Sequence, residues 1–335
     1  MTAIQPDNTA WFRRRLRLGP PPRRTPHPAQ DRASALARFE ELAALDDGIP
    51  EATRSRLFEP DGAAIATLVI WHGFTNAPSQ FTAIAERLRT LGYRVLVPRM
   101  PYHGEADTLT RNLARLTPEI LVDHVGTCVD IAAGFGDAVW AIGLSAGATM
   151  AGWAAATRPE VARLVVAAPL VAPVGFPEPL VRLFVKSPRI VPGIYWWWDP
   201  RVKAKITGSP HAYPGFPLRG IMPFLHLSEW LYDGSVAVGH ELERTVLVTN
   251  PGDFAIRKDV ARSFVDRVFA PASIRFGEAL VDPELKWMHD FVDPLSPSTG
   301  TTEQVTAVLL AGLGTGEPTA TGVLVEPLVG EQPAS

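Results

Sequence analysis

Residues 138–149 read AVWAIGLSAGAT, an apolar run that leads into a glycine-flanked serine and then into the start of a helix. The segment GLSAG at 143–147 fits the pattern G-x-S-x-G, in which the serine sits on strained backbone between a strand and a helix and needs small neighbours. Gly143, Gly147 and Ala148 meet that need. The helix directs its positive N-terminal end toward Ser145 and favours a developing oxyanion there. Ser145 is therefore the candidate nucleophile, and an idle serine in a glycine-rich turn is the alternative.

Apolar runs and helical patterns alternate on both sides of this segment. The runs that predict strands lie at 67–71, 94–98, 138–144, 163–168, 245–249 and 273–280. The patterns that predict helices lie at 32–45, 79–91, 119–133, 146–156, 258–269 and 301–313. Strands that are apolar throughout and are separated by helices predict an α/β fold, with a mostly parallel sheet flanked by helices on both faces.

The alternation stops between residues 171 and 235, which are dense in proline and aromatic side chains. We expect this segment to be a cap, or lid, inserted above a core formed by residues 31–170 and 236–314. Residues 1–30 combine prolines with a cluster of arginines and contain no apolar signal segment. We therefore expect a flexible basic arm, with contact to an anionic membrane as the alternative. Residues 315–335 are rich in Gly, Pro and Thr and predict a disordered tail.

Composition narrows the possible partners and compartment. Of the 335 residues, 46% are hydrophobic, which is enough to bury a large core. The net charge of -3 gives no reason to expect nucleic acid as a partner. The single cysteine, Cys128, excludes an intramolecular disulfide and leaves no thiolate pair for a metal site. Residues 138–157 are uncharged and long enough to span a bilayer, but their glycines favour a buried strand, turn and helix. We expect a cytoplasmic protein without stable membrane insertion.

A second motif, HGFT at 72–75, follows the predicted strand 67–71 directly. Acyl transfer passes through a tetrahedral oxyanion that needs two fixed N–H donors. The backbone amide of Phe74 in this loop can supply one donor. The amide of Ala146, directly after the candidate nucleophile, can supply the other. We interpret His72 itself as a structural imidazole that holds the loop by hydrogen bonds.

Three segments in this order, HGF at 72–74, PRMPYHG at 98–104 and GLSAG at 143–147, resemble the landmarks of the α/β-hydrolase family. The similarity covers roughly residues 60–310 and is closest to bacterial carboxylesterases and monoacylglycerol-lipase-like members. One departure is Tyr102, which stands where many members have glycine. The resemblance implies a Ser-Asp-His triad in that chain order, an oxyanion hole of the kind just described, and no metal or organic cofactor.

The triad order implied by the resemblance selects an acid and a base. Asp253 lies in the loop after the predicted strand 245–249, behind a Pro-Gly turn that would present its side chain. His289 is the one histidine after Asp253 and follows the last predicted strand. Asp290 and Asp293 lie too close along the chain to His289 to serve as the acid, so we interpret them as loop or capping residues. We interpret Asp259 as a surface residue of the next predicted helix.

The aromatic segment would form the substrate pocket. A cap lined with Trp, Tyr, Leu and Met would bury an apolar acyl or alcohol group, and each buried CH₂ contributes about 0.8 kcal/mol. We expect substrate contacts from side chains on the oxyanion loop, the nucleophile turn and the cap: Thr75, Leu144, Trp197 and Tyr213. The alternative is that the tryptophans at 196–198 form the core of the cap itself.

The leading hypothesis is a carboxylic ester hydrolase that acts on a small to medium apolar ester through an acyl-enzyme intermediate. A serine hydrolase or acyltransferase that acts on an amide, lactone, thioester or carbon–carbon bond is the second hypothesis, because fold does not fix function. A hydrolase-like domain that binds a small molecule without turning it over is the third. The expected partner is thus a small-molecule ester.

Overall fold

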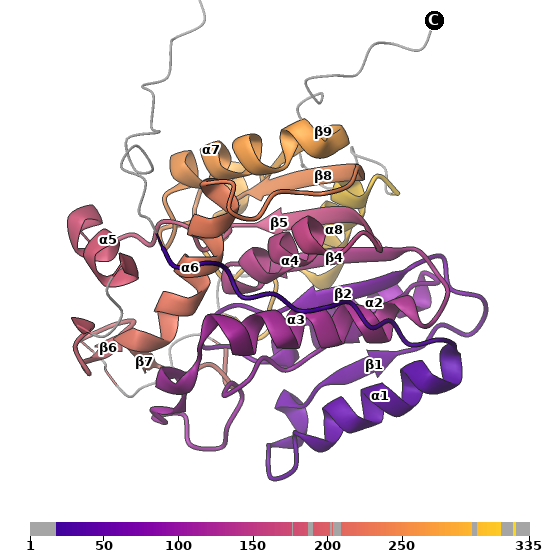
Figure 1. Ribbon diagram of the computed structural model, residues 1–335, viewed down its shortest axis with the longest axis horizontal. Helices are drawn as coiled ribbons and strands as arrows, with labels where there is room; N and C mark the ends of the chain where they lie inside the picture. Colours follow the sequence, from indigo (N-terminus) through magenta and orange to yellow (C-terminus); the bar gives the residue numbers. More distant parts are fainter. Residues whose placement is uncertain are drawn as a thin grey trace, which may run out of the picture.

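The computed structural model describes residues 18–175, 177–186, 190–201, 203, 209–296, 300–315 and 324–325. A central sheet runs through the molecule with helices packed on both of its faces (Figure 1). Its strands are β1 (Arg56–Phe58), β2 (Thr67–Trp71), β3 (Arg94–Val97), β4 (Val139–Leu144), β5 (Val161–Ala167), β8 (Leu242–Thr249), β9 (Ser273–Leu280) and β10 (Leu324–Val325). Their order in the sheet is β1-β3-β2-β4-β5-β8-β9-β10.

The sheet is parallel from β3 to β9, and β1 and β10 pair with it in antiparallel register at the two edges. A separate antiparallel hairpin joins β6 (Tyr195–Trp197) to β7 (Gly215–Pro217). The predicted mostly parallel α/β sheet is therefore confirmed. Strand β1 was missed because it is three residues long and only half-buried, which leaves no clear hydrophobic period.

Two helical layers cover the sheet. The helices are α1 (Arg32–Ala44), α2 (Thr82–Thr90), α3 (Pro118–Ala133), α4 (Ala146–Thr157), α5 (Glu178–Lys186), α6 (Met222–Tyr232), α7 (Lys258–Val268) and α8 (Thr302–Leu313). Short 3₁₀ turns occur at Glu51–Thr53, Pro78–Phe81, Asn112–Arg115, Leu218–Ile221, Ala270–Ala272 and Pro283–Leu285. Helices α1, α3, α4, α6 and α7 pack in succession on one face, and α2 and α8 pack together on the other.

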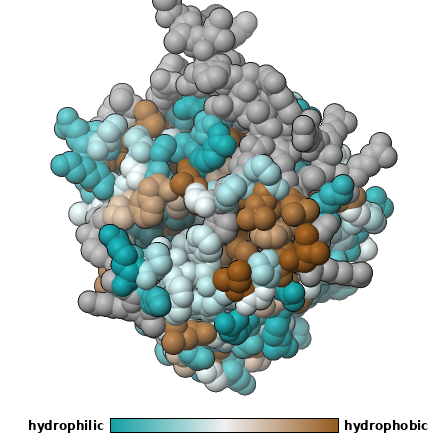
Figure 2. Space-filling view, turned by 90° about the vertical axis from the view of Figure 1, so that its left-hand side faces the viewer, coloured by the Kyte–Doolittle hydropathy of each residue, from teal (hydrophilic) through white to brown (hydrophobic). Residues whose placement is uncertain are grey.

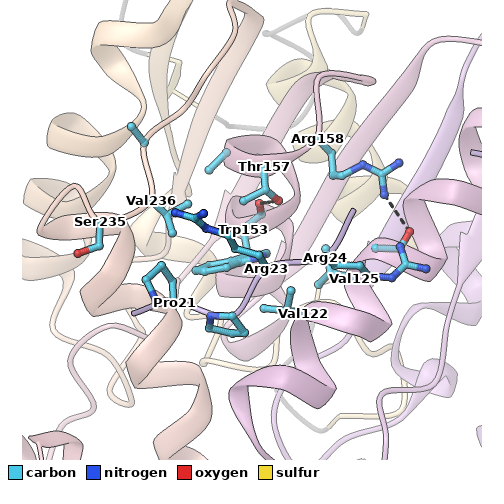
Figure 3. A pocket seen from close by; sticks show the side chains of 14 residues that line it. Pro21, Arg23, Arg24, Val122, Val125, Trp153, Thr157, Arg158, Ser235 and Val236 are labelled. Atoms are coloured by element: carbon cyan, nitrogen blue, oxygen red, sulfur yellow. Dashed lines mark hydrogen bonds between the residues drawn. The ribbon is translucent and has the colours of Figure 1, made fainter. Parts of the chain in front are cut away.

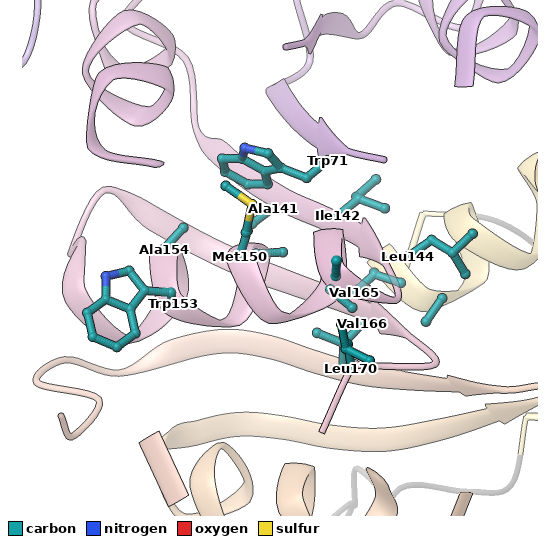
Figure 4. Close-up of a cluster of buried hydrophobic side chains, with 14 of the residues drawn as sticks. Trp71, Ala141, Ile142, Leu144, Met150, Trp153, Ala154, Val165, Val166 and Leu170 are labelled. Carbon is teal, nitrogen blue, oxygen red and sulfur yellow. The ribbon is translucent and has the colours of Figure 1, made fainter. Parts of the chain in front are cut away.

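Strand β4 lies at the centre of the core and is buried along its whole length. Helix α4 packs directly on β4, and Figure 4 shows Trp71, at the end of β2, beside Met150 of α4. Each of these side chains is fully buried. Burying one such side chain contributes about 1.5–3 kcal/mol, so this layer fixes α4, and with it the turn at Ser145, against the sheet.

Residues 18–30 correct the prediction of a flexible arm over 1–30. They run along the outside of α3 and α6, where the indigo segment crosses the helices in Figure 1. The Arg24 guanidinium donates to Asp130 Oδ2 at 2.7 Å, and Trp230 Nε1 donates to the carbonyl of Gly19 at 2.9 Å. The buried Asp130 carboxylate is the physical reason, because a charge on α3 that is removed from water needs cationic partners. Residues 1–17 lie outside the described residues.

A cavity of about 330 Å³ is lined by residues of this segment, of α3 and of α4 (Figure 3). Arg158 at the end of α4 lies beside it and donates to the carbonyl of Gly126 at 3.0 Å. The Arg158 guanidinium also donates to Asp130 Oδ1 at 2.6 Å, so Arg24 and Arg158 share one carboxylate. This buried cluster fastens the N-terminal segment to the helical layer.

The segments predicted as cap and tail differ in part from their predictions. Residues 171–235 hold α5, the β6–β7 hairpin and α6, but α6 packs against α3 and α4 and belongs to the helical layer. Helix α6 was missed because its side chains are buried almost all round, which removes the amphipathic period. Most of the predicted tail at 315–335 lies outside the described residues, but residues 324–325 form β10. Among the described residues, no helix is long and apolar enough to cross a membrane.

We predict that Asp130→Ala lowers the free energy of unfolding by about 1.5–3 kcal/mol, because Arg24 and Arg158 lose the buried carboxylate that they share while Arg158 keeps only its pair with Glu160 at 2.8 Å. Urea unfolding followed by circular dichroism measures the change. Glu243→Ala, which breaks an exposed pair with Arg163, is the matched control and costs less than about 1 kcal/mol. Equal losses in the two variants would contradict this account of the cluster.

Candidate active site

Ser145 sits on the strained backbone that the sequence predicted. It has φ 56° and ψ -116° and joins the end of β4 to the first turn of α4. A residue with a side chain rarely adopts positive φ and needs its surroundings to hold it there. Two hydrogen bonds do so: the Ser145 amide donates to the carbonyl of Ala167 at 2.8 Å, and the Ser145 carbonyl accepts from the amide of Leu170 at 3.1 Å.

The glycines on either side of Ser145 are required by space. A Cβ at Gly143 would lie 2.1 Å from the carbonyl oxygen of Gly147. A Cβ at Gly147 would lie 2.0 Å from the carbonyl oxygen of Trp71, at the end of β2. Both obstacles are backbone atoms, which cannot move aside as a flexible side chain can. The G-x-S-x-G pattern thus reflects close contact between the first turn of α4 and the neighbouring strand.

The structure brings together the predicted acid and base. Asp253 follows β8, His289 follows β9, and His289 Nδ1 donates to Asp253 Oδ2 at 2.8 Å. The Asp253 side chain is buried, and its other oxygen accepts from the amides of Ala255 at 2.7 Å and Ile256 at 3.3 Å. These bonds fix the carboxylate in the orientation that meets the imidazole.

The electrostatics of this pair favour an ionised acid and a basic imidazole. Burial raises the pKa of Asp253, but the charge of His289 and the hydrogen bonds to the carboxylate outweigh burial and hold the net pKa below its ordinary value. Burial lowers the pKa of His289, but the charge and hydrogen bond of Asp253 outweigh it, so the net pKa lies above 6.5. Because Nδ1 carries the proton bonded to Asp253, Nε2 is the nitrogen available to accept a proton.

Ser145 and His289 line one cavity of about 810 Å³, which is within the usual range for small-molecule sites. No hydrogen bond joins these two side chains in the part of the chain that the structure describes. Such contacts between nucleophile and base are often long in the free enzyme and shorten when substrate binds.

The amides of Phe74 and Ala146 lie on the two loops beside Ser145. Phe74 is in the loop after β2, and Ala146 is the first residue of α4. Neither amide donates a hydrogen bond to another residue within the described ranges. The loop is held by the Gln80 side chain, whose Oε1 accepts from the amide of Gly73 at 2.7 Å.

His72 has the structural role that the sequence suggested. Its Nε2 accepts from the amide of Met100 at 3.1 Å, so Nδ1 carries the proton and donates to the carbonyl of Gly73 at 2.9 Å. Burial holds the pKa of His72 well below 6.5, which keeps the ring neutral. His72 thus connects the loop after β2 to the loop after β3 and does not line the cavity.

Three of the four predicted substrate contacts line the cavity, namely Thr75, Leu144 and Tyr213. The prediction for Trp197 is wrong, because its ring packs on Tyr195 with centroids 4.8 Å apart and lies outside the cavity lining. The neighbours Trp196 and Trp198 line the cavity instead. Side chains alternate along a strand, and the sequence of three tryptophans did not indicate which of them faces inward.

Asp290 is a cavity residue that the sequence analysis interpreted as a loop acid. Its Oδ1 accepts from Gln80 Nε2 at 2.7 Å and its Oδ2 from Asn76 Nδ2 at 3.1 Å, and all three side chains line the cavity. Burial raises the pKa of Asp290 to about 6. Asp290 thus connects the loop of His289 to the loop after β2, which contains Phe74 and Thr75. Asp293 behaves as predicted and caps a turn by accepting from the amide of Leu295 at 2.8 Å.

Within the described residues, no cluster of three or more His, Cys, Asp and Glu side chains could hold a metal ion. Two carboxylates of the site, those of Asp253 and Asp290, already have hydrogen-bond partners. Asp253 is paired with His289, and Asp290 accepts from two amide side chains.

Comparison with known proteins supports the fold. A family model described as the alpha/beta hydrolase fold matches residues 66–221, the part that contains β2, the turn at Ser145 and most of the predicted cap. No curated protein matches the sequence significantly.

Several solved structures have a similar fold. A structure from work on LipS and LipT, two metagenome-derived lipolytic enzymes, has a TM-score of 0.58 at 17% identity and covers 78% of this chain and 98% of that one. DcsB, solved with a substrate analogue, has a TM-score of 0.52 at 17% identity over 78% and 93%. The monoacylglycerol lipase of Paleococcus ferrophilus has a TM-score of 0.50 at 15% identity over 68% and 88%. The chain has the α/β-hydrolase fold and resembles the carboxylesterases and monoacylglycerol lipases that share it.

We predict that the pKa of His289, measured by NMR titration of histidine-labelled protein, lies above 6.5 and falls in two variants. Asp253→Asn lowers it most, because it removes the carboxylate that bonds to Nδ1 and opposes the effect of burial most strongly. Asp290→Asn lowers it less, because a more weakly coupled negative charge is removed. Glu284→Gln, an exposed change in the same loop region, is the control and leaves the pKa unchanged. An unchanged pKa in Asp253→Asn would contradict the pairing.

Proposed function

We propose that the chain is a serine hydrolase that cleaves carboxylic esters, with Ser145, His289 and Asp253 as its catalytic triad. One observation carries the proposal: strained Ser145 and Asp253-bound His289 line the same cavity, beside the amides of Phe74 and Ala146. The likeness of the fold to a lipolytic enzyme and a monoacylglycerol lipase supports an ester as the substrate.

In the first step, Ser145 Oγ attacks the ester carbonyl while its proton passes to His289 Nε2. Asp253 stabilises the imidazolium through the bond to Nδ1. The negative charge that develops on the carbonyl oxygen is met by the amides of Phe74 and Ala146. Each such donor contributes about 10²- to 10³-fold in rate, because it is already oriented when the charge appears.

In the second step, the imidazolium of His289 gives its proton to the leaving alcohol, and the acyl group stays on Ser145 as an ester. Water then enters, loses a proton to the same imidazole and attacks the acyl carbonyl. Collapse of this second tetrahedral species releases the carboxylic acid and returns the proton to Ser145. The same pair of amides holds the oxyanion in both steps, so one fixed geometry serves the whole cycle.

The walls of the cavity favour an apolar ester of small to medium size. Five of its side chains are large, apolar and more than a third exposed: Val174, Trp196, Trp198, Phe254 and Met288. Figure 2 shows hydrophobic surface on the side of the molecule that bears α5 and the hairpin. Each additional CH₂ buried there would contribute about 0.8 kcal/mol, or about fourfold in affinity.

We predict that Ser145→Ala lowers kcat/KM for p-nitrophenyl esters by at least about 10³-fold, because no other group can form the acyl-enzyme. Hydrolysis of esters from acetate to palmitate measures the loss, and the optimum chain length reports the size of the cavity. Ser296→Ala, which also removes a hydroxyl from the cavity wall, is the matched control and keeps most of the activity.

Labelling with a fluorophosphonate separates the alternatives. The wild-type protein and Ser296→Ala are expected to react and Ser145→Ala is not. Folded wild-type protein that neither reacts nor hydrolyses any ester would favour the non-catalytic binding protein. Labelling without ester hydrolysis would favour an amide, lactone, thioester or carbon–carbon bond as the substrate.

A further inference from the structure

The residue after the first oxyanion donor is itself strained. Thr75 has φ 64°, a conformation that is unusual for any residue with a side chain and especially for a β-branched one. Such a backbone persists only where the surrounding structure holds it. Since Thr75 directly follows Phe74, whatever holds Thr75 also influences the direction in which the Phe74 amide points.

The contacts that hold Thr75 come from the β6–β7 hairpin. Trp198 Nε1 donates to Thr75 Oγ1 at 2.9 Å, and the amide of Tyr213 donates to the Thr75 carbonyl at 2.7 Å. The Thr75 hydroxyl in turn donates to the carbonyl of Phe74 at 2.6 Å. The amide of Trp198 bonds to the carbonyl of Pro214 at 3.1 Å and extends the hairpin ladder, so both donors lie at the same end of the hairpin.

Aromatic packing holds the neighbouring side chain. The ring of Phe74 meets that of Phe216 in β7 edge-on, with centroids 4.9 Å apart, and Phe216 meets Trp198 at 4.8 Å. Phe224 in α6 contacts Phe74 from another side at 5.5 Å. Aromatic pairs in these orientations attract through their quadrupoles as well as by burial, so the position of Phe74 depends on the hairpin.

Tyr213 also anchors the hairpin to a second loop beside the site. Its hydroxyl accepts from the amide of Glu105 at 2.8 Å and donates to the carbonyl of Tyr102 at 3.2 Å. Tyr102 is the position where the family resemblance expects glycine, and it has φ 64°. A fully buried Tyr213 thus ties the loop after β3 and the oxyanion loop to one point of the hairpin.

We propose that the β6–β7 hairpin positions the oxyanion hole: Trp198 and Tyr213 hold Thr75, and through it the Phe74 amide, in the orientation that meets the oxyanion. The hairpin residues act through Thr75, so they are positioning residues and not catalytic ones. The expected effect on kcat rests on the proposed function, whereas the expected effect on the loop after β2 rests on the contacts alone. If the hairpin were only a passive wall of the cavity, its residues would affect only how tightly the substrate binds.

Trp198→Phe tests the proposal because it keeps a ring against Phe216 and removes the indole donor to Thr75. We expect kcat to fall about tenfold with both p-nitrophenyl acetate and octanoate, less than the 10²- to 10³-fold that follows loss of a whole donor. KM for the acetate is expected to stay unchanged. Trp197→Phe makes the same change one residue earlier, where the ring packs on Tyr195 outside the cavity, and leaves kcat unchanged.

A double-mutant cycle identifies the route of the effect. Thr75→Val removes the hydroxyl that Trp198 reaches, so Trp198→Phe should lower kcat further by less than about twofold in that background. A passive wall predicts a different result, in which Trp198→Phe raises KM only for the octanoate and leaves kcat unchanged in both backgrounds. That result would overturn the proposal.

Hydrogen–deuterium exchange tests the structural part without activity. Trp198→Phe should increase exchange in a peptide spanning residues 73–81 and not in one spanning 139–150, and Trp197→Phe should change neither. If wild-type protein hydrolyses no ester, the proposed function fails, but faster exchange at 73–81 would still support the hairpin contact. Unchanged exchange there in Trp198→Phe would overturn the hairpin proposal whatever the activity of the wild type.

Discussion

The close approach of two backbone segments at Gly147 is the constraint on which the site depends. The first turn of α4 comes so near the end of β2 that a Cβ at Gly147 would lie 2.0 Å from the Trp71 carbonyl oxygen. This approach places the start of α4 beside the loop that leaves β2, so the amides of Ala146 and Phe74 belong to adjacent segments. Ser145, which joins the end of β4 to this first turn, has φ 56°.

The other groups of the site reach the same edge because the strands are parallel. The carboxyl ends of β4, β8 and β9 lie together, and Ser145, Asp253 and His289 each follow one of them. The pairing of Asp253 with His289 then depends on loop geometry, and the buried carboxylate is held by the amides of Ala255 and Ile256. Residues far apart along the chain thus come to the same edge of the sheet because of the strand order.

Two features outside the strand–helix alternation complete the cavity. Asp290 and Gln80 join the loop of His289 to the loop after β2, because Gln80 Nε2 donates to Asp290 and Gln80 Oε1 accepts from the amide of Gly73. The hairpin contacts the loop after β2 through Trp198 and Tyr213, which both donate hydrogen bonds to Thr75. The catalytic groups of the proposed triad therefore lie within a set of hydrogen bonds that links the two loops and the hairpin into one unit.

The sequence by itself determined the central strands, the parallel sheet and the strained turn at Ser145, because each depends on local requirements. It pointed to Asp253 and His289 through the chain order that the family resemblance implies. Small residues around Ser145 and apolar runs such as 67–71 are visible in a few neighbouring letters. Only the tertiary structure decided that Trp196 and Trp198 face the cavity while Trp197 does not, that Asp290 meets Gln80, and that residues 18–30 are fastened to Asp130. These features depend on the direction of each side chain and on partners about a hundred or more residues away along the chain. The hydrophobic period of a short segment carries no information about either.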